Sequence, residues 1–210
     1  MDVILIRHGQ SVANQKGLLI SNETDDLTNA GLQQSQALAA HLQTTIAQAD
    51  VLVCSPWRRA LSTAEIVYGS RMDQAQIEHR ITETHAGKHG TWLESNFNRA
   101  FPDFYQDLSR RYDGGESHKD MSLRVTDWVE SVLLAQAQQP SLLVCVTHGG
   151  PISAMLQHLM GMPFEARYPS FTVPNASYTK LQWRADLNRY CVACMGVTPA
   201  AHEARLCQTS

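Results

Sequence analysis

Three short apolar runs recur along the chain, and each ends abruptly in polar or small residues. The runs cover residues 3–6, 51–54 and 142–146, and they are followed by Arg-His-Gly, Ser-Pro-Trp and Thr-His-Gly-Gly. Continuous apolar runs of this length are typical of strands that are buried on both faces of a parallel sheet. The pattern therefore predicts three central strands.

Segments with a helical period follow or separate these runs. The segment that starts at Thr28, a residue suited to cap a helix, carries Leu38, Leu42 and Ile46 at four-residue spacing. Three further segments place apolar side chains on one helical stripe: residues 57–68, 122–137 and 152–160. Strand and helix thus alternate, which predicts an α/β fold with three α/β/α layers, a mostly parallel central sheet and helices on both faces.

Two features lie outside this alternation, within what we expect to be a single domain of residues 1–210. Residues 176–183 and 189–194 read as a late hairpin around the turn at 186–188. Residues 82–115 are rich in His, Gly and aromatic side chains, and they predict a substrate-facing insertion over one end of the sheet. Its aromatic residues suit either a small core under the insertion or an apolar substrate wall: Trp92, Phe97, Phe101 and Phe104.

Composition and charge exclude several classes of protein. Of 210 residues, 43% are hydrophobic and 18% are charged, which is typical of a globular chain. The net charge of −3 and the pI near 6.3 provide no overall positive field for nucleic acid or an anionic membrane surface. The first apolar run is too short for a secretory signal or a membrane span, so we expect a cytoplasmic location.

The cysteines and histidines do not form a convincing metal site. Cys54 and Cys145 lie inside apolar runs, where a reduced thiol behaves as a small hydrophobe. Cys191 and Cys194 form a lone C-x-x-C pair in a segment with strand-like alternation. His85 and His89 lie four residues apart, but two glycines, at 87 and 90, argue against a helix that would align them. We expect no metal and no cofactor.

Charged donors gather where the predicted strands end. Arg7 and His8 follow the first run, Arg59 lies shortly after the second, and His148 follows the third. The carboxyl ends of parallel strands meet at one edge of a sheet, which is where ligands bind in open α/β folds. Two guanidinium groups and two imidazoles in one pocket favour a phosphate as the ligand.

Five segments, in order along the chain, carry a resemblance to a known family. They are residues 5–14 (LIRHGQSVAN), 55–60 (SPWRRA) with Thr63-Ala64, Glu83 ahead of Gly90-Thr91-Trp92, residues 114–117 (GGES) and residues 146–150 (VTHGG). Together they resemble the histidine phosphatase superfamily, the group that includes the cofactor-dependent phosphoglycerate mutases. An Arg-His-Gly triplet alone is weak, whereas five ordered segments are specific.

The resemblance implies a role for each matching residue. It implies His8 as the nucleophile that accepts the phosphoryl group and Glu83 as the proton donor to the leaving group. It implies that the phosphate is held by a further set of matching residues: Arg7, Asn14, Arg59, His148 and Gly149. The first step of such a reaction is nucleophilic attack by an imidazole nitrogen, which divides one difficult transfer into two easier ones.

Glu83 has structural competitors in the sequence. Glu78 and Glu94 lie close by, in a region where an exposed glutamate is ordinary. Glu116 and Ser117 stay outside the catalytic set, because Ser117 is equally suited to cap the helix that follows.

The resemblance implies a metal-independent phosphomonoester hydrolase of the phosphatase branch, acting on a small phosphorylated metabolite. A cofactor-dependent phosphoglycerate mutase-type phosphotransferase is one alternative. We favour hydrolysis because the chain is shorter than mutases of the family and carries Gln10-Ser11 where their motif usually has Glu. A non-catalytic phosphate-binding module is the other alternative. The expected partner is a small phosphate ester, neither nucleic acid nor membrane is expected, and a homodimer stays open.

Overall fold

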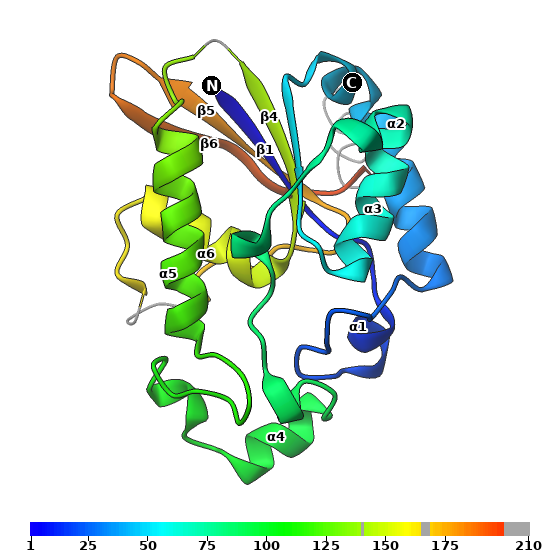
Figure 1. Ribbon diagram of the computed structural model, residues 1–210, viewed down its shortest axis with the longest axis vertical. Helices are drawn as coiled ribbons and strands as arrows, with labels where there is room; N and C mark the ends of the chain where they lie inside the picture. The colour runs from blue at the N-terminus through cyan, green and yellow to red at the C-terminus, as the bar shows by residue number, and fades with distance from the viewer. Residues whose placement is uncertain (140, 165–168, 200–210) are drawn as a thin grey trace, which may run out of the picture.

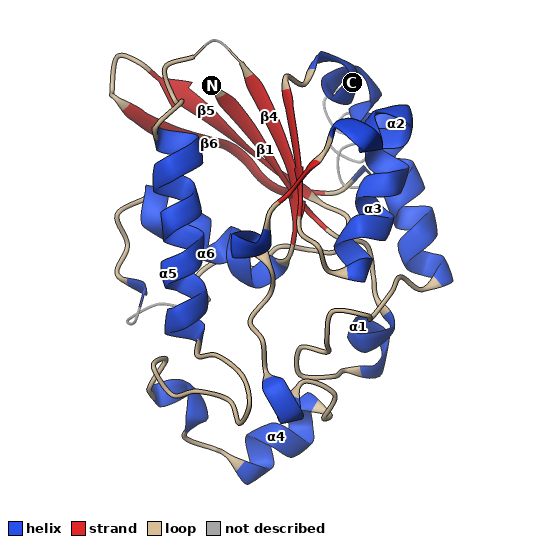
Figure 2. Ribbon diagram, in the orientation of Figure 1, coloured by secondary structure: helices blue, strands red, loops and turns tan. Residues whose placement is uncertain are grey.

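A six-stranded sheet forms the centre of the computed structural model, which describes residues 1–139, 141–164 and 169–199 (Figure 2). The strands are β1 (Asp2–Arg7), β2 (Val51–Cys54), β3 (Gln76–Ile77), β4 (Leu142–Thr147), β5 (Tyr178–Arg184) and β6 (Arg189–Val197), in the spatial order β3-β2-β4-β1-β5-β6. The first four are mutually parallel, and β5 and β6 extend the sheet as an antiparallel hairpin. The α/β prediction and the late hairpin are confirmed.

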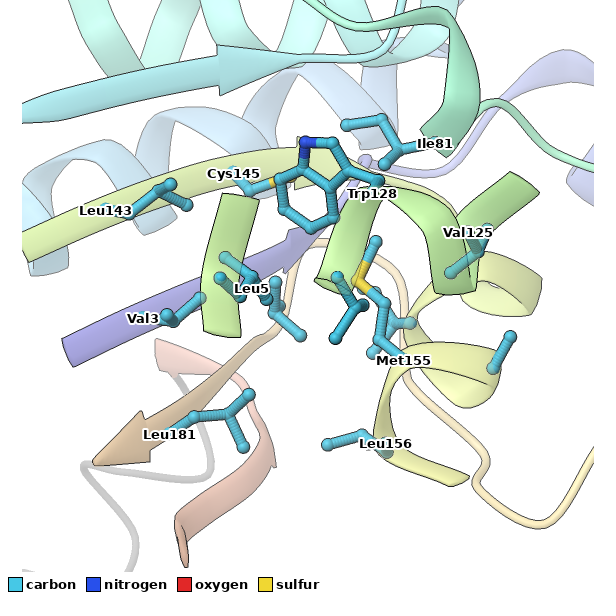
Figure 3. Packing of buried hydrophobic residues seen from close by; sticks show 14 of the residues in the cluster. Val3, Leu5, Ile81, Val125, Trp128, Leu143, Cys145, Met155, Leu156 and Leu181 are labelled. Carbon is cyan, nitrogen blue, oxygen red and sulfur yellow. The ribbon is translucent and has the colours of Figure 1, made fainter. Parts of the chain in front are cut away.

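Helices cover both faces of this sheet, because side chains of the central strands alternate between two cores. On one face, residues such as Ile6 and Val146 pack against α2 (Asn29–Gln48) and α3 (Arg58–Tyr68). On the other face, residues such as Leu5 and Cys145 pack against α5 (His118–Trp128) and α6 (Gly149–Leu159). Figure 3 shows this second core, with Trp128 and Met155 beside the sheet. The predicted layers are confirmed.

Capping explains where the predicted helices begin. The Thr28 hydroxyl accepts the Gly31 N–H at 3.0 Å at the start of α2, as the sequence predicts. α5 begins at His118, four residues before the predicted position, because Ser117 and Asp120 form a reciprocal capping box. The last turns of this segment continue as a π-helix, Val129–Leu134.

Residues 82–115 lie beyond the carboxyl ends of the parallel strands (Figure 1). They contain a 3-10 turn (Gly87–His89), α4 (Glu94–Ala100) and a second 3-10 turn (Phe104–Gln106), and no strand lies within them. Four buried residues form a separate small core there: Ala86, Phe97, Phe104 and Tyr112. The small-core interpretation is therefore confirmed for Phe97 and Phe104, and Phe101 packs against this core partly buried. It is wrong for Trp92, whose side chain is 42% exposed.

The remaining elements are short. α1 (Val12–Lys16) follows β1, the 3-10 turn Gly69–Gln74 follows α3, and the 3-10 turn His79–Ile81 leads into residues 82–115. Among the described residues, we find no helix that is both long and apolar enough to span a membrane.

Candidate active site

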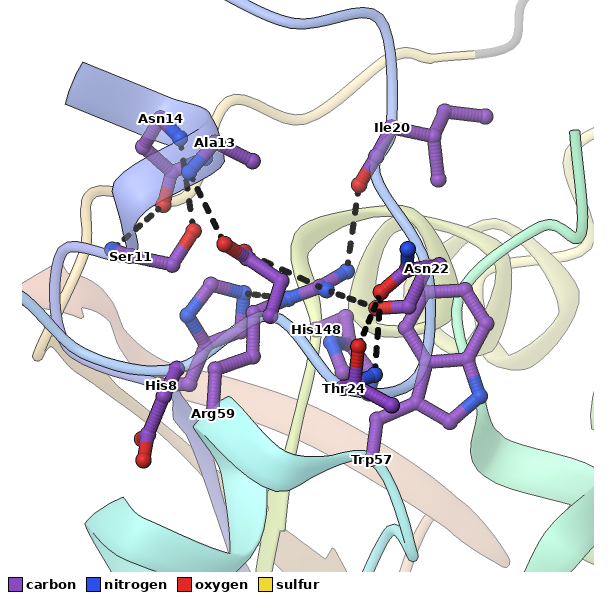
Figure 4. Close-up of polar contacts among 12 residues, drawn as sticks. His8, Ser11, Ala13, Asn14, Ile20, Asn22, Thr24, Trp57, Arg59 and His148 are labelled. Atoms are coloured by element: carbon purple, nitrogen blue, oxygen red, sulfur yellow. Dashed lines mark hydrogen bonds and ion pairs between the residues drawn. The ribbon is translucent and has the colours of Figure 1, made fainter. Parts of the chain in front are cut away.

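His8 lies directly after β1, and its imidazole is held in one tautomer. Its Nδ1–H donates to the carbonyl oxygen of Gly9 at 2.7 Å, and Nε2 therefore carries the lone pair. Arg59 Nε donates to that Nε2 at 3.1 Å (Figure 4). Burial, and then the positive charges of Arg59 and Arg7, hold the pKa of His8 well below its usual value near 6.5. A neutral, buried imidazole thus presents one nucleophilic nitrogen.

The backbone of His8 is hydrogen-bonded to the last residue of β4 and to the residues that lead into β5. The N–H of His8 donates to Thr147 O at 3.0 Å, and its carbonyl oxygen accepts from Ala176 N at 3.0 Å. Gly9 then passes so close to the first turn of α2 that a Cβ would lie 2.5 Å from Gly31 O. Only glycine fits this approach, so the position of the imidazole is determined by the sheet and by α2 together.

Arg59 extends from the first turn of α3 and is 3% exposed. Its Nη1 donates to Asn22 O at 3.1 Å, and Nη2 donates to Ile20 O at 3.4 Å (Figure 4). Asp25 adds a carboxylate 3.7 Å from Nη1, and the guanidinium stacks over the ring of Trp57 at 4.6 Å. Burial lowers the pKa of Arg59 to about 10, against the raising effects of Glu83 and Asp25. The group stays a cation near neutral pH.

Arg7 contributes a second guanidinium from the end of β1. Its Nη1 donates to Val173 O, while its buried Nε has no hydrogen-bond partner among the described residues. Burial lowers the pKa of Arg7, and Glu83 opposes this shift. Gly149 lies against the group: a Cβ at that position would be 3.4 Å from Arg7 Cζ. An unpartnered buried N–H is costly unless a ligand satisfies it.

His148 faces His8 from the end of β4, with 5.1 Å between the ring centroids. Its Nε2 is hydrogen-bonded to Ser55 Oγ at 2.8 Å, while the buried Nδ1 has no partner within the described part of the chain. Burial, and then Arg59, lower the pKa of His148 well below 6.5. This second imidazole is therefore neutral and has one free ring nitrogen in the interior.

Glu83 sits at the amino end of α6. Its Oε2 accepts the Gly150 N–H at 3.1 Å, and its Oε1 accepts its neighbour's N–H, that of Thr84, at 2.9 Å. Backbone N–H groups at a helix start attract a carboxylate. The competitor Glu78 is instead paired with Arg80, and Glu94 lies in the first turn of α4. The structure thus holds Glu83 at the backbone two residues after His148, close enough to Arg7 and Arg59 to raise their pKa values.

A family comparison agrees with this arrangement. The model of the histidine phosphatase superfamily (branch 1) matches residues 3–192. The chain belongs to the histidine phosphatase superfamily. The resemblance seen in its five segments is confirmed.

Several relatives of this histidine phosphatase have phosphatase names. The adenosylcobalamin/alpha-ribazole phosphatase of Escherichia coli is 30% identical over 180 residues, covering 80% of this chain and 83% of that protein. The glucosyl-3-phosphoglycerate phosphatase of Mycolicibacterium vanbaalenii is 30% identical over 196 residues (88% and 86% covered). A 2,3-bisphosphoglycerate-dependent phosphoglycerate mutase of Thermoplasma acidophilum is also 30% identical, with 84% of each chain covered.

Solved structures give the same result. A putative alpha-ribazole-5′-P phosphatase from Escherichia coli superposes with a TM-score of 0.79 at 26% identity, covering 94% of this chain and 97% of that chain. A mycobacterial glucosyl-3-phosphoglycerate phosphatase complexed with VO3 superposes with a TM-score of 0.77 at 26% identity, with 94% and 99% covered. Family and relatives together confirm the prediction of a phosphomonoesterase acting on small phosphate esters.

Asn14 of this histidine phosphatase is linked to His8 through Asn175, and its side chain is already partly engaged. Its Oδ1 accepts from Ser11 N at 3.1 Å and from Asn175 Nδ2 at 3.0 Å. Asn175 Nδ2 also lies 3.2 Å from the carbonyl oxygen of His8. Asn175 was not predicted from the sequence, because it lies outside every predicted element and motif.

Ser55 and Asp25 were also missed as members of the site. Ser55 directly follows β2 and lies next to the end of β4, so its position in the strand order was a usable signal. Asp25 lies in an irregular loop and carries no such signal.

Metal ligands are not assembled in the described parts of this histidine phosphatase, where no group of three or more His, Cys, Asp or Glu side chains could hold an ion. Cys191 and Cys194 lie on β6 as free thiols. His89 packs among aromatic rings, with Phe97 and Phe101 each 5.3 Å away between centroids.

The two neutral imidazoles predict how the stability of this histidine phosphatase depends on pH. Both have a lower pKa in the folded state than in the unfolded chain, so the unfolded chain binds more protons below pH ~6.5. The free energy of unfolding should therefore fall as the pH decreases below about 6.5, by up to about 1.4 kcal/mol per pH unit for each histidine.

Thermal unfolding of the wild type and of His8→Asn between pH 8 and pH 5.5 measures this effect. The variant should lose stability less steeply on acidification, because one titrating group is gone. Equal slopes for the two proteins would show that His8 is not held neutral.

Proposed function

We propose that the protein hydrolyses phosphate monoesters of small molecules in two steps, through a phosphohistidine at Nε2 of His8. One observation carries this proposal: Nε2 of His8 is the unprotonated nitrogen of a buried, neutral imidazole, and it lies beside the guanidinium of Arg59. Arg7 Nε and His148 Nδ1 are buried without protein partners among the described residues. These groups match what a phosphoryl group with three peripheral oxygens needs.

In the first step, Nε2 of His8 attacks the phosphorus atom and the ester P–O bond breaks. Glu83 donates a proton to the leaving oxygen, so the product departs as an alcohol. The guanidinium groups of Arg7 and Arg59 stabilise the charge on the peripheral phosphoryl oxygens, and Nδ1–H of His148 donates to one of them. Nδ1–H of His8, held by Gly9 O, keeps the attacking ring oriented.

In the second step, a water molecule attacks the phosphorus atom of phosphohistidine. The Glu83 carboxylate accepts the proton of that water, the P–N bond breaks, and its electron pair returns to Nε2 of His8. Inorganic phosphate leaves, and Glu83 is again protonated for the next cycle. No step in this scheme requires a metal ion.

We also propose that residues 82–115 select the organic part of the substrate. Glu83 is the second residue of the segment. Further along, Gly90 O accepts from Ser21 N at 2.7 Å, in the loop that holds Arg59. It thereby lies beside both the proton donor and the phosphate-binding arginine. A cytoplasmic location is supported by the unpaired thiols of Cys54 and Cys145.

The test is release of inorganic phosphate from a panel of esters. We would include p-nitrophenyl phosphate, phosphoserine, α-ribazole phosphate, glucosyl-3-phosphoglycerate and simple sugar phosphates, with and without a metal chelator. We expect hydrolysis of at least one natural ester and equal rates with the chelator present. Light scattering of the same preparation determines whether the protein is a homodimer.

The mutase alternative is favoured by the mutase names of several relatives, at 27–30% identity. It predicts conversion of 3-phosphoglycerate, primed with its bisphosphate, without release of inorganic phosphate. That outcome would overturn the hydrolase proposal. Phosphate binding without turnover of any ester would instead indicate a non-catalytic binding module.

A further inference from the structure

The backbone that carries Glu83 is irregular, yet its carbonyl groups are all satisfied by side chains. Arg124 of α5 donates through Nη1 to Arg80 O at 2.8 Å and to Thr82 O at 2.7 Å, and through Nη2 to Glu83 O at 2.9 Å. Thr147 Oγ1 donates to the remaining one, Ile81 O, at 2.6 Å. Four consecutive carbonyl groups, from the 3-10 turn His79–Ile81 through Glu83, are thus held by side chains.

Glu116 completes this arrangement from the other end of the insertion. Its Oε2 accepts from Arg124 Nε at 3.1 Å, and its Oε1 accepts from Arg124 Nη2 at 2.6 Å. The same Oε1 accepts the His85 N–H at 2.9 Å, and the Glu116 N–H donates to His85 O at 2.9 Å. Arg124 and Glu116 therefore restrain the chain on both sides of Glu83.

We propose that Arg124 and Glu116 are positioning residues, and that they hold the Glu83 carboxyl group where it protonates the leaving oxygen. This inference rests on the proposed hydrolase mechanism. We call the pair the Arg124–Glu116 clamp.

The clamp depends on the planar fork of arginine. All five guanidinium N–H groups of Arg124 are engaged, two with Glu116 and three with carbonyl oxygens. Both side chains are mostly buried, at 21% and 16% exposure, so the contacts are shielded from water. Because proton transfer depends steeply on geometry, a shift of about 1 Å in Glu83 would cost on the order of 100-fold in rate.

Charge alone is the competing explanation for an effect of Arg124. Its positive charge is one of several that lower the pKa of His148, after burial and the nearer cations. Arg124→Lys separates the two explanations, because lysine keeps the charge but has three donors at one point instead of a planar fork. Positioning predicts that Arg124→Lys behaves like Arg124→Met, whereas a purely electrostatic role predicts wild-type behaviour for the lysine variant.

The decisive measurement compares two leaving groups in the full-length protein. Phenyl phosphate needs its leaving oxygen protonated, whereas the phenolate of 2,4-dinitrophenyl phosphate is stable enough to leave without a proton. The ratio kcat/KM reports only the steps up to release of the phenol, so hydrolysis of phosphohistidine does not mask the result. Arg124→Met should lower kcat/KM by about 100-fold for phenyl phosphate and by less than about threefold for the dinitrophenyl ester.

Arg71→Met is the matched control. Arg71, in the 3-10 turn Gly69–Gln74, also donates to backbone carbonyls, including Ala49 O at 2.8 Å. These carbonyls lie at the carboxyl end of α2, away from the site. It should leave both substrates unaffected. Glu116→Gln, which loses part of the clamp but keeps an acceptor, provides a milder variant whose preference should shift in the same direction, even if Arg124→Met does not fold.

The outcomes separate this inference from the proposed function. Equal losses on both esters, or wild-type rates in Arg124→Lys, would reject the clamp while leaving the hydrolase intact. If Glu83→Gln itself shows no selective loss on phenyl phosphate, Glu83 is not the acid and the mechanism fails. If the wild type releases no phosphate from either ester, the proposed function fails.

Discussion

Replacing His8 with asparagine is expected to abolish phosphate release, with a loss of at least about 10³-fold in kcat. Asparagine keeps a polar side chain of similar reach but has no nucleophilic ring nitrogen, so no covalent intermediate forms. The wild type, mixed rapidly with a ³²P-labelled ester and quenched in base, should carry an acid-labile label at His8. The variant should carry none.

His158→Asn is the control for this experiment. His158 lies in α6, and it pairs at the surface with Glu130 at 2.7 Å, so its loss should leave turnover unchanged. Label that appears at His148 in the wild type, or substantial turnover by His8→Asn, would contradict the assignment of the nucleophile.

Replacing Arg59 with methionine is the second change with a large expected effect. The buried guanidinium lies 3.1 Å from Nε2 of His8 and is shielded from water, so its charge would interact strongly with a phosphoryl group bound there. We expect kcat/KM to fall by about 10²–10³-fold and competitive inhibition by inorganic phosphate to weaken by a similar factor. Steady-state kinetics with phosphate as the inhibitor measure both quantities.

Arg58, the preceding residue of α3, provides the matched control. Its guanidinium is 45% exposed and pairs with Asp26 and Glu65 at 3.1 Å, and exposed pairs of this kind contribute about 0–1 kcal/mol. Arg58→Met should therefore leave kinetics and phosphate inhibition unchanged. Equal kinetic losses in the two variants would show that Arg59 acts through the helix and not through contact with phosphate.

The ends of β1, β2 and β4 explain why much of the site is predictable from the sequence. A buried parallel strand reads as an apolar run, and the residues just after it must lie at the shared edge of the sheet. His8 and His148 directly follow the strands that contain two of these runs, and Arg59 lies in the first turn of the helix that follows the remaining run. That these three side chains lie close together therefore follows from the apolar runs and from the rule that parallel strands end at the same edge of the sheet.

Other parts depend on contacts that no local pattern encodes. β3 consists of two residues, and both are exposed. It therefore has no apolar run, and the sequence did not predict it. The partners of Arg59 are carbonyl oxygens of Ile20 and Asn22 in an irregular loop, and carbonyl groups are common to every residue type. Arg124 shows the same difficulty. The hydrophobic period predicts the helix that carries it, but not which backbone carbonyl groups accept hydrogen bonds from its guanidinium.

The two hydrogen bonds between His85 and Glu116 hold the two ends of residues 86–115 together. The two ends of the loop between them are joined by hydrogen bonds at a narrow neck, so the intervening chain starts and finishes at the same place. The entropic cost of closing a loop rises slowly with its length, by about 0.6 kcal/mol for each doubling of the number of residues. A new loop grafted at this neck would leave Glu83 outside the exchanged piece, and it would need to supply an acceptor for the Ser21 N–H in place of Gly90 O.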